Sequence, residues 1–415
     1  MVTRGRGAIR QLAAALFLNQ VGSGIGFIGV PVIVYERTGG SGLWLGITFF
    51  FTFGIVAALG PLAGAIADRF DRKRLIVIGD VLAGCSWLVL LLGPEDPVWL
   101  IAWTVVGQVL SLPAGPASGA AIPNLVDEED LDWANGTLAV ARKGSQVIGF
   151  AFGGVIAQFL GADVAFGINV VSFFVSAVVV AGVRGRFQAE DAETEVGRRG
   201  SVLEGFRVLW RDPALRSLFL VWTILFVTID AAIVGDLPIA KELGWAETGY
   251  GLMNATWGLG AVAGAFLGRR ITRRFEPIAV LIGILGAAGG YLMIAATPWF
   301  VFVLLGNAIA GGTDAGDEVA GFSIIQRSTA DEVRGRAMSA VFTAGLVAQA
   351  FAFIVAGLLV EWLGPRVVYA ICGLGSAATI PLWLTMYRTI RRREAIEAQA
   401  GSSVTESLPQ EPSPS

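Results

Sequence analysis

The segment Gly64-Ala65-Ile66-Ala67-Asp68-Arg69-Phe70-Asp71-Arg72-Lys73-Arg74 decides the fold. A long apolar run precedes this charged segment, at about residues 43–67, and another follows it, at about 75–92. Two membrane helices joined by so short a turn must fold back on each other. Lys and Arg are retained on the cytoplasmic side of membrane proteins. We therefore expect a helical hairpin whose turn lies in the cytoplasm, and this hairpin fixes the orientation of the remaining spans.

The composition excludes most other classes of protein. Hydrophobic residues make up 54% of the 415 residues and charged residues only 15%, and the mean hydropathy is +0.68, which indicates an all-α integral membrane protein. Both cysteines lie in apolar runs and the chain has no histidine, so we expect no disulfide framework, no metal site, no cofactor and no enzyme activity. The net charge of -3 argues against a nucleic-acid partner. No Gly-Lys is followed by Ser or Thr, so an ion gradient rather than ATP is the expected source of energy.

Runs of about 20 apolar residues predict twelve transmembrane helices in the plasma (inner) membrane. The first extends from about Gln11 to Val34, and it is too long for the core of a signal peptide. The others are expected at about 43–67, 75–92, 98–121, 134–160, 165–183, 215–235, 249–268, 278–296, 299–325, 337–363 and 367–387. With both termini in the cytoplasm, the inner segments hold 27 of the 30 Lys and Arg residues, which supports this topology.

An internal repeat predicts two pseudo-symmetric six-helix bundles. Five residues of the first hairpin recur 200 positions later, where Gly60, Gly64, Arg69, Lys73 and Arg74 are matched by Gly260, Gly264, Arg269, Arg273 and Arg274. We expect an N-terminal bundle at 1–190, a cytoplasmic linker with an amphipathic helix at 191–214, a C-terminal bundle at 215–390 and a disordered cytoplasmic tail at 391–415. A monomer is favoured.

The first hairpin resembles the loop between helices 2 and 3 of the major facilitator superfamily, in which a glycine precedes Asp-Arg and then Arg-Lys. The family usually has glycine where this chain has Asp71, and aspartate is a residue that tolerates a left-handed turn. The resemblance implies a cytoplasmic gate between the halves, in which Asp68 meets the N-terminus of a helix from the other half. The expected gate residues are Gly64, Asp68, Arg69, Arg72, Lys73, Asp127 and Asp130.

Two further loops narrow the resemblance to one branch of this superfamily. Residues 121–136 and, more loosely, 326–336 resemble loops of the branch that includes enterobactin exporters and macrolide efflux proteins. This likeness implies export. The acids at 127–130 are candidates to pair with Arg72 and Lys73 in one conformation and to release them in the other. The alternative is a solvated acidic loop.

Polar residues within the spans are candidates for the transport machinery. The superfamily fold places a substrate cavity between helices 1, 4, 7 and 10. The expected cavity residues are Asn19, Gln20, Gln108, Asp230, Asn307 and Asp314. The alternative for the amides is that they only bond neighbouring helices.

Acidic residues within the spans are candidates to carry protons, because a charged group in hydrocarbon is costly. Asp314, Asp317 and Glu318 lie at i, i+3 and i, i+4 spacing, so we expect all three on one helix face, with at least one protonated. Asp314, Asp317 and Asp230 are the expected coupling residues, and Asp80 is a further candidate. The alternative is that Asp80 and Glu318 lie at the wetted cytoplasmic ends and that Asp317 is structural.

These observations predict a secondary transporter that exports a small hydrophobic or amphipathic molecule, as in drug efflux, by proton antiport and alternating access. The expected partners are the lipid bilayer, the small-molecule substrate and protons. Two alternatives stay open: a dedicated exporter of a siderophore or lipid-like metabolite, and, from another class, a non-transporting membrane receptor.

Overall fold

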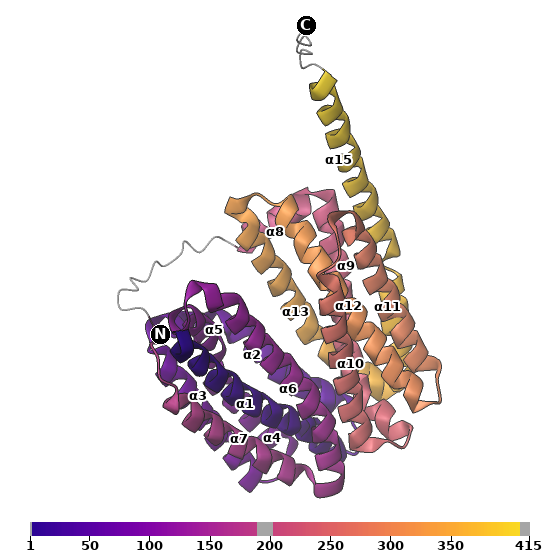
Figure 1. Cartoon of the computed structure of the whole chain (residues 1–415). Coiled ribbons are helices and arrows are strands. Elements are labelled where there is room, and N and C mark those ends of the chain that lie inside the picture. Colours follow the sequence, from indigo (N-terminus) through magenta and orange to yellow (C-terminus); the bar gives the residue numbers. More distant parts are fainter. Residues whose placement is uncertain (1, 189–201, 407–415) are drawn as a thin grey trace.

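The computed structural model describes residues 2–188 and 202–406, and all regular elements in these ranges are helices (Figure 1). The first group comprises α1 (Val2–Arg37), α2 (Gly42–Arg69), α3 (Arg72–Leu92), α4 (Pro97–Ser111), α5 (Ala114–Leu125), α6 (Leu131–Leu160) and α7 (Ala162–Gly182). The second comprises α8 (Val202–Arg211), α9 (Pro213–Glu242), α10 (Ala246–Gly268), α11 (Glu276–Ala296), α12 (Phe300–Ser328), α13 (Asp331–Leu363), α14 (Pro365–Ala377) and α15 (Ile380–Glu406). Short 3-10 turns precede α6 and α11, at Glu128–Asp130 and Arg273–Phe275.

The two groups of helices lie side by side and repeat one packing pattern. Figure 1 shows α1–α7, in indigo to magenta, beside α8–α15, in pink to yellow. In the first group α1 packs on α6 and α7, and in the second α9 packs on α13 and α14. Likewise α3 packs on α4 and α7, and α11 packs on α12 and α14. We call the two groups the N-half and the C-half; the domain boundaries near 190 and 215 stay a prediction.

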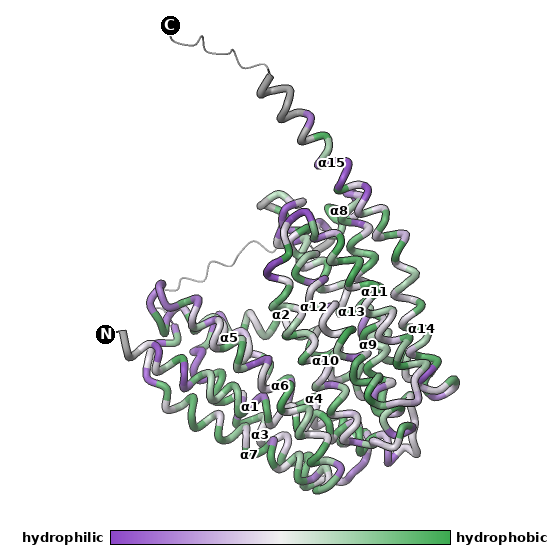
Figure 2. The backbone as a smooth tube through the Cα atoms, turned by 45° about the vertical axis from the view of Figure 1, so that its right-hand side comes forward, coloured by the Kyte–Doolittle hydropathy of each residue, from purple (hydrophilic) through white to green (hydrophobic). Residues whose placement is uncertain are grey.

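The helices carry the apolar surface that a bilayer requires. Nine helical stretches in the described ranges are long and apolar enough to cross a membrane, with α4 and α5 forming one stretch and α14 and α15 another. Figure 2 shows apolar residues along the helices and hydrophilic residues at their ends. The long helices α6, α10 and α12 are less apolar; α6 carries Arg142 and Lys143, and α12 carries three acids. The number twelve therefore stays a prediction.

Capping residues and glycine turns determine where helices begin. Asp71 has φ of -58°, so it does not use the left-handed turn expected from its replacement of glycine; its carboxylate instead accepts a hydrogen bond from the Arg74 N–H at 2.7 Å and caps α3. Asp212 caps α9 in the same way ahead of Pro213. Gly161 and Gly364 take φ of 90° and 81° at corresponding turns of the two halves, a conformation that glycine adopts without strain.

Two helices predicted as continuous are each divided. The run expected at 98–121 breaks between α4 and α5 at Leu112 and Pro113, because proline has no N–H to continue the ladder of hydrogen bonds. The run expected at 367–387 breaks between α14 and α15, and α15 then continues to Glu406. Its extension past residue 390 differs from the expected disordered tail, because Ala, Glu and Gln between 394 and 400 favour helix. Residues 407–415 lie outside the described ranges.

The linker forms a short helix on the C-half. The predicted amphipathic helix is α8, and residues 189–201 lie outside the described ranges. Phe206 of α8 packs edge-on against Phe219 of α9, with ring centroids 5.7 Å apart. Glu204 pairs with Arg336 of α13 at 2.5 Å. These contacts attach the linker to the C-half.

The halves meet closely at one end, which we call the Gly42 end because it carries Gly42 and the turns at 38–41 and 243–245. A Cβ on Gly42 would lie 2.7 Å from the carbonyl oxygen of Gly357, and one on Gly154 would lie 2.9 Å from Cα of Gly251. Backbones of α2 and α13, and of α6 and α10, therefore touch with no side chain between them. Polar contacts among the described residues also join the halves here: Lys241 pairs with Glu36 at 2.8 Å, Ser41 and the Leu43 N–H donate to Glu361 at 2.6 and 3.0 Å, and the Thr248 N–H donates to Gln158 at 3.0 Å.

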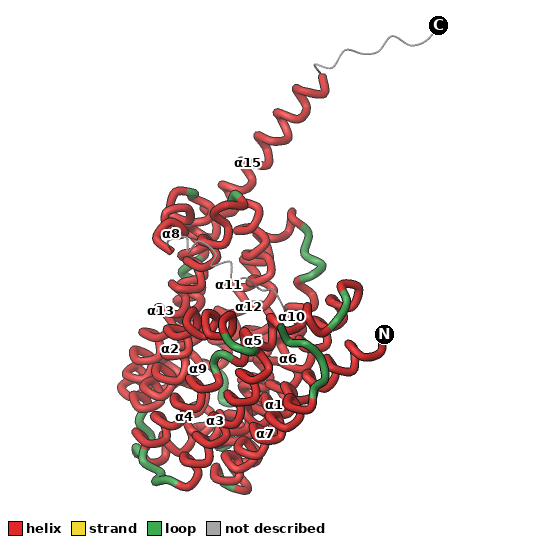
Figure 3. Tube along the Cα trace, turned by 90° about the vertical axis from the view of Figure 1, so that its left-hand side faces the viewer, coloured by secondary structure: helices red, strands yellow, loops and turns green. Residues whose placement is uncertain are grey.

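The halves separate toward the other end, which we call the Asp68 end because it carries Asp68 and the turns at 70–71 and 269–275. Further along α2, a Cβ on Gly54 would lie 3.7 Å from Ala350 of α13. A Cβ on Gly60 or Gly64 would meet no described atom within 4 Å. Figure 3 shows the molecule turned by 90° from Figure 1, so that the N-half faces the viewer.

A side chain at Gly46 is expected to force the Gly42 end open. A Cβ on Gly46 would clash with the carbonyl oxygen of Phe353 and would lie 3.1 Å from Cα of Gly357. Gly46→Leu therefore has no room unless α2 and α13 move apart. Overpacking of this kind costs about 1–3 kcal/mol. Spin labels on cysteines at positions 39 and 244, with Cys85 and Cys372 replaced by serine, would report a longer distance in the variant. Gly289→Leu is the matched control, because a Cβ there meets nothing within 4 Å. An unchanged distance in the Gly46 variant would contradict the contact.

An ion pair at the Asp68 end predicts a pH dependence of stability. Arg6 of α1 donates to both carboxylate oxygens of Asp130, with the shortest bond 2.6 Å from Nη2 to Oδ1. These hydrogen bonds hold the pKa of Asp130 below its ordinary 3.8. Because the folded-state pKa is the lower one, the stabilisation is complete above 3.8 and is lost as the pH falls below it.

Asp130→Asn is therefore expected to lower the melting temperature at about pH 6.5 and to have less effect at about pH 3, measured on the purified protein in detergent. Asp163→Asn, at an exposed position on α7, is the control and is expected to have no such pattern. An Asp130 effect of the same size at both pH values would show that the pair is not the source.

Candidate functional site

Five of the six predicted cavity residues lie in two cavities, and the sixth, Asp314, lines neither of them. The first, which we call the N-half cavity, has a volume of about 370 Å³ and is lined only by α1–α7. Its lining includes Asn19, Gln20, Thr52, Asp80, Trp87 and Gln108. The second, the central cavity, has a volume of about 230 Å³ and lies between the halves. Its lining includes Phe53, Lys143 and Phe150 of the N-half and Asp230, Trp257 and Asn307 of the C-half. Phe27 lines both cavities.

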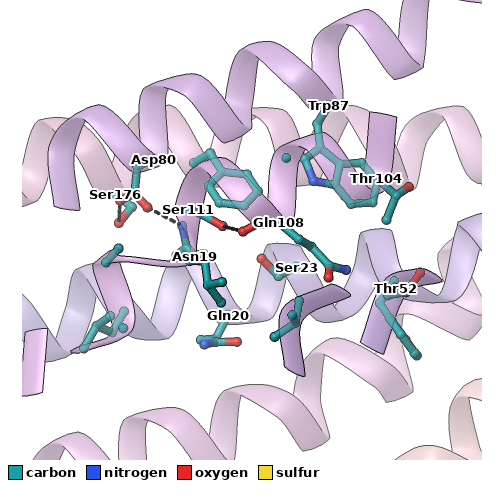
Figure 4. Close-up of a pocket in the computed structure, with 18 of the residues that line it drawn as sticks. Asn19, Gln20, Ser23, Thr52, Asp80, Trp87, Thr104, Gln108, Ser111 and Ser176 are labelled. Carbon is teal, nitrogen blue, oxygen red and sulfur yellow. Dashed lines mark hydrogen bonds between the residues drawn. The ribbon is translucent and has the colours of Figure 1, made fainter. Parts of the chain in front are cut away.

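A buried carboxylate with two neutral hydrogen-bond donors lies in the wall of the N-half cavity (Figure 4). Asp80 of α3 accepts a hydrogen bond from Nδ2 of Asn19 at 3.3 Å and from Oγ of Ser176 at 2.7 Å. Asp80 is buried, with 6% of its surface exposed, so it does not lie at a wetted helix end. Asn19 lines the cavity and also donates a hydrogen bond to α3. The two alternatives for this amide, a place in the cavity and a bond to a neighbouring helix, are therefore compatible.

The break in the fourth predicted helix lies against the same cavity. Ser111, Leu112, Ala114 and Gly115 all line it. Because Pro113 has no N–H for the carbonyl of Val109, the Leu112 N–H donates to that carbonyl at 3.4 Å, and the Ser111 hydroxyl donates to the carbonyl of Gln108 at 3.2 Å. Interrupted helices in membrane proteins occur where the backbone lines a cavity.

The central cavity combines acids, a lysine and aromatic rings. Asp230 of α9 accepts a hydrogen bond from Nε2 of Gln349 at 2.8 Å. Asn307 of α12 is buried, and its Nδ2 finds no hydrogen-bond partner among the described residues. Lys143 of α6 enters the cavity from the opposite half. Phe27 packs on both Phe53 and Phe150, with ring centroids 5.9 and 5.6 Å apart.

The three acids of α12 point to different neighbours. Asp317 is buried, accepts a hydrogen bond from Nε1 of Trp222 at 3.0 Å and packs against Gly283 of α11. Asp314 and Glu318 are within electrostatic range of Lys143 of the N-half, and Asp317 is within electrostatic range of both of these acids. The common helix face of the three acids stays a prediction, and Asp317 is the one that bonds Trp222 of the C-half. Asp314 also lies within electrostatic range of Asp230, although it does not line either cavity.

The expected gate residues all make their contacts within the N-half. Arg72 donates to the carbonyl of Ala120 at 2.7 Å, and Lys73 donates to the carbonyl of Val183 at 2.9 Å. Asp130 pairs with Arg6 rather than with either of these cations. The remaining polar gate residues, Asp68, Arg69 and Asp127, are exposed, and Gly64 faces open space. The gate between halves therefore stays a prediction, and in this structure its residues are apart from the C-half.

Sequence reasoning missed three charged residues of these cavities: Arg142 of the N-half cavity, and Lys143 and Asp236 of the central cavity. Lys143 was counted with the cytoplasmic basic residues, whereas it lies inside α6 and lines the central cavity. The signal that could have found it is the polar triplet Arg142, Lys143 and Gln146 in an otherwise apolar run. Asp236 was also passed over; it is buried and accepts a hydrogen bond from the hydroxyl of Tyr369.

The chain matches the family model described as Major Facilitator Superfamily, over residues 12–239 and 223–409. It is 23% identical over 407 residues to the multidrug efflux pump Tap of Mycobacterium bovis (strain BCG / Pasteur 1173P2), covering 91% of this chain and 93% of Tap. It is 24% identical over 337 residues to the enterobactin exporter EntS of Escherichia coli O1:K1 / APEC, covering 79% of each chain.

The fold is also that of solved transporters. A crystal structure of a mutant of the nucleoside transporter NupG superposes with a TM-score of 0.77 at 12% identity, and covers 92% of this chain and all of that one. This likeness concerns the fold alone. Together with the apolar helices and the match to the family model, it confirms a multi-pass membrane protein. The chain therefore belongs to the Major Facilitator Superfamily, in the branch that resembles the efflux pump and the enterobactin exporter, and it is a transporter rather than an enzyme.

Proposed function

We propose that the chain exports a small hydrophobic or amphipathic molecule in exchange for protons, by alternating access. The observation that carries this proposal is the central cavity, which lies between two halves that touch at the Gly42 end and separate toward the Asp68 end. A transporter that rocks two halves about a midplane site takes this form when it is open to one side. In the second state the halves touch at the Asp68 end and separate at the Gly42 end.

The proposed topology has twelve spans, with α4 and α5 counted as one and α14 and α15 as one. The bundles are 1–190 and 215–390, and the protein acts as a monomer in the plasma membrane. Basic residues cluster at the Asp68 end, for example Arg69, Arg74 and Arg269, so this end and both termini are assigned to the cytoplasm. The structure is then open to the cytoplasm, the side from which an exporter takes up its substrate.

The lining of the central cavity supports an amphipathic substrate. Phe27, Phe53, Phe150 and Trp257 offer apolar faces, and Asp230 offers a negative charge. Cavities of this kind bind a molecule by its apolar surface and orient it with a few polar groups. An organic cation with a ring system suits both features, through Coulomb attraction and contact between its charge and the aromatic faces.

Proton coupling is assigned to Asp314, Asp230 and Asp317. Asp314 is within electrostatic range of Asp230 and of Lys143, and Asp230 and Lys143 both line the central cavity. A proton on one of these carboxylates removes the charge that holds a cationic substrate, so protons and substrate compete for the same groups. Competition of this kind couples the entry of a proton to the release of substrate on the other side.

The relatives support export as the direction. Tap is named as a multidrug efflux pump and EntS as an enterobactin exporter, and the chain resembles both over most of its length. Drug-type efflux is the first choice, because five aromatic side chains line the central cavity beside its two carboxylates. The alternative function is export of a siderophore or lipid-like metabolite, and the transport experiment described next distinguishes the two.

Asp314→Asn is expected to abolish gradient-driven transport. In inside-out vesicles with an acidic interior, the wild type should accumulate a fluorescent lipophilic cation, whereas the variant should not exceed vesicles without the protein. The amide cannot carry the proton, although it keeps the size of the side chain. Asp163→Asn, at an exposed position outside both cavities, is the matched control and should transport as the wild type does.

Two results would overturn parts of the proposal. If Asp314→Asn transports normally, this carboxylate does not couple transport to protons. If the wild type ignores the cation at every gradient but moves a catecholate siderophore, the dedicated exporter replaces drug efflux.

Lys143→Gln is expected to strengthen the apparent affinity for a lipophilic cation roughly three- to tenfold, because a positive charge that opposes the substrate is removed from the cavity. The measurement is the KM of gradient-driven uptake. Arg142→Gln is the matched control, since the neighbouring cation lines the N-half cavity instead. An unchanged or higher KM for Lys143→Gln would show that this lysine does not compete with the substrate.

A further inference from the structure

Among the described residues, the place in the C-half that corresponds to the N-half cavity is closed by contact between α10 and α12. On α10, a Cβ at Gly260 would lie 2.9 Å from the backbone nitrogen of Gly312, and one at Gly264 would lie 3.0 Å from its Cα, so α10 and α12 touch. The corresponding residues of α2, Gly60 and Gly64, face open space, and α2 stands away from the broken helix α4–α5. The cavity fills this separation, with lining from α2 and from both α4 and α5. The internal repeat therefore does not account for the N-half cavity.

Asp80 lacks the partner that a buried carboxylate needs. It receives one hydrogen bond at each oxygen, from Asn19 and from Ser176, both of which are neutral. A carboxylate has about four acceptor positions, so about two remain unused. No described Lys or Arg forms an ion pair with it, and Arg142, the only cation in the cavity lining, is not within 4.0 Å. Burial of a charge without an opposite charge is costly, so the site favours a cation or a proton from outside the chain.

The rest of the cavity suits the apolar body of such a cation. Phe27, Phe49, Trp87 and Phe173 supply aromatic faces, and its volume of about 370 Å³ is in the range of cavities that bind small organic molecules. In Figure 4, Asp80 and Ser176 lie toward one side of the cavity, and Trp87 and Thr104 lie toward the other. A molecule with a charged group at one end and a ring at the other matches this separation.

We propose that the N-half cavity is a binding site for amphipathic primary amines, in which Asp80 binds the ammonium group and Trp87 contacts the apolar body. Asn19 and Ser176 are positioning residues that hold the carboxylate. An ammonium group has three N–H donors, enough to fill the acceptor positions that Asp80 leaves open. Phe27 lines this cavity and the central cavity, so the same ring borders both sites. The binding of an amine at this site does not depend on the proposed function. Only the identification of that amine as a transported molecule rests on it.

The test is an equilibrium titration of the full chain in lipid nanodiscs with a matched pair of probes. The first probe carries a dansyl fluorophore on a pentylamine chain, and the second is its neutral N-acetyl derivative. Asp80→Asn is expected to weaken binding of the amine about tenfold, equivalent to about 1.4 kcal/mol, and to leave the acetylated probe within about twofold. Ser176→Ala is expected to weaken binding of the amine less. Asp163→Asn, with an exposed side chain outside both cavities, should bind both probes as the wild type does.

Equal binding of the amine by wild type and Asp80→Asn would overturn the inference, and so would an equal loss of both probes. The titration uses no gradient, so it remains informative if the chain does not transport. Charge-selective binding without transport would leave this site in place and overturn the exporter. Gradient-driven transport without any effect of Asp80 on binding would leave the exporter in place and overturn this site.

Discussion

Contact between backbones at the Gly42 end sets the arrangement of the whole molecule. Two helix pairs, α2 with α13 and α6 with α10, cross the boundary between the halves, and each pair touches through glycines, as at Gly42 with Gly357 and Gly154 with Gly251. Because glycine has no side chain, the helices approach as closely as their backbones permit. Further along α2 the clearance grows, so the halves diverge and the central cavity opens between them.

The same glycine spacing is used in two ways in the two halves. In the C-half, Gly260 and Gly264 bring the backbones of α10 and α12 into contact. In the N-half, a Cβ at Gly60 or Gly64 would meet nothing within 4 Å, and a cavity with its own buried carboxylate, Asp80, is lined by α2, α4 and α5. A repeated sequence thus gives one half that is packed tightly and another that can hold a ligand.

Hydropathy and the charged hairpin were enough to predict the fold, since each is a local property of the sequence. The positions of Asn19, Gln20 and Gln108 in a cavity were also predictable, because polar amides in apolar helices have few other places to lie. The sequence did not predict that these amides lie in a different cavity from Asp230 and Asn307, because this depends on how far α2 lies from α4. Lys143 was missed because a basic residue counts toward the cytoplasmic charge in a topology test, although it lies well inside α6.

The polar contacts suit a molecule whose two states differ little in free energy. At the Gly42 end, Lys241 and Glu36 are partly exposed, and exposed ion pairs contribute only about 0–1 kcal/mol. At the Asp68 end, Arg72 and Lys73 are bound to carbonyl oxygens of their own half, so neither is left buried without a partner while the halves are apart. Neither end is therefore held by a strong bond across the halves. Small differences in binding free energy, such as those from a proton or a substrate in the central cavity, are then sufficient to shift the population between states.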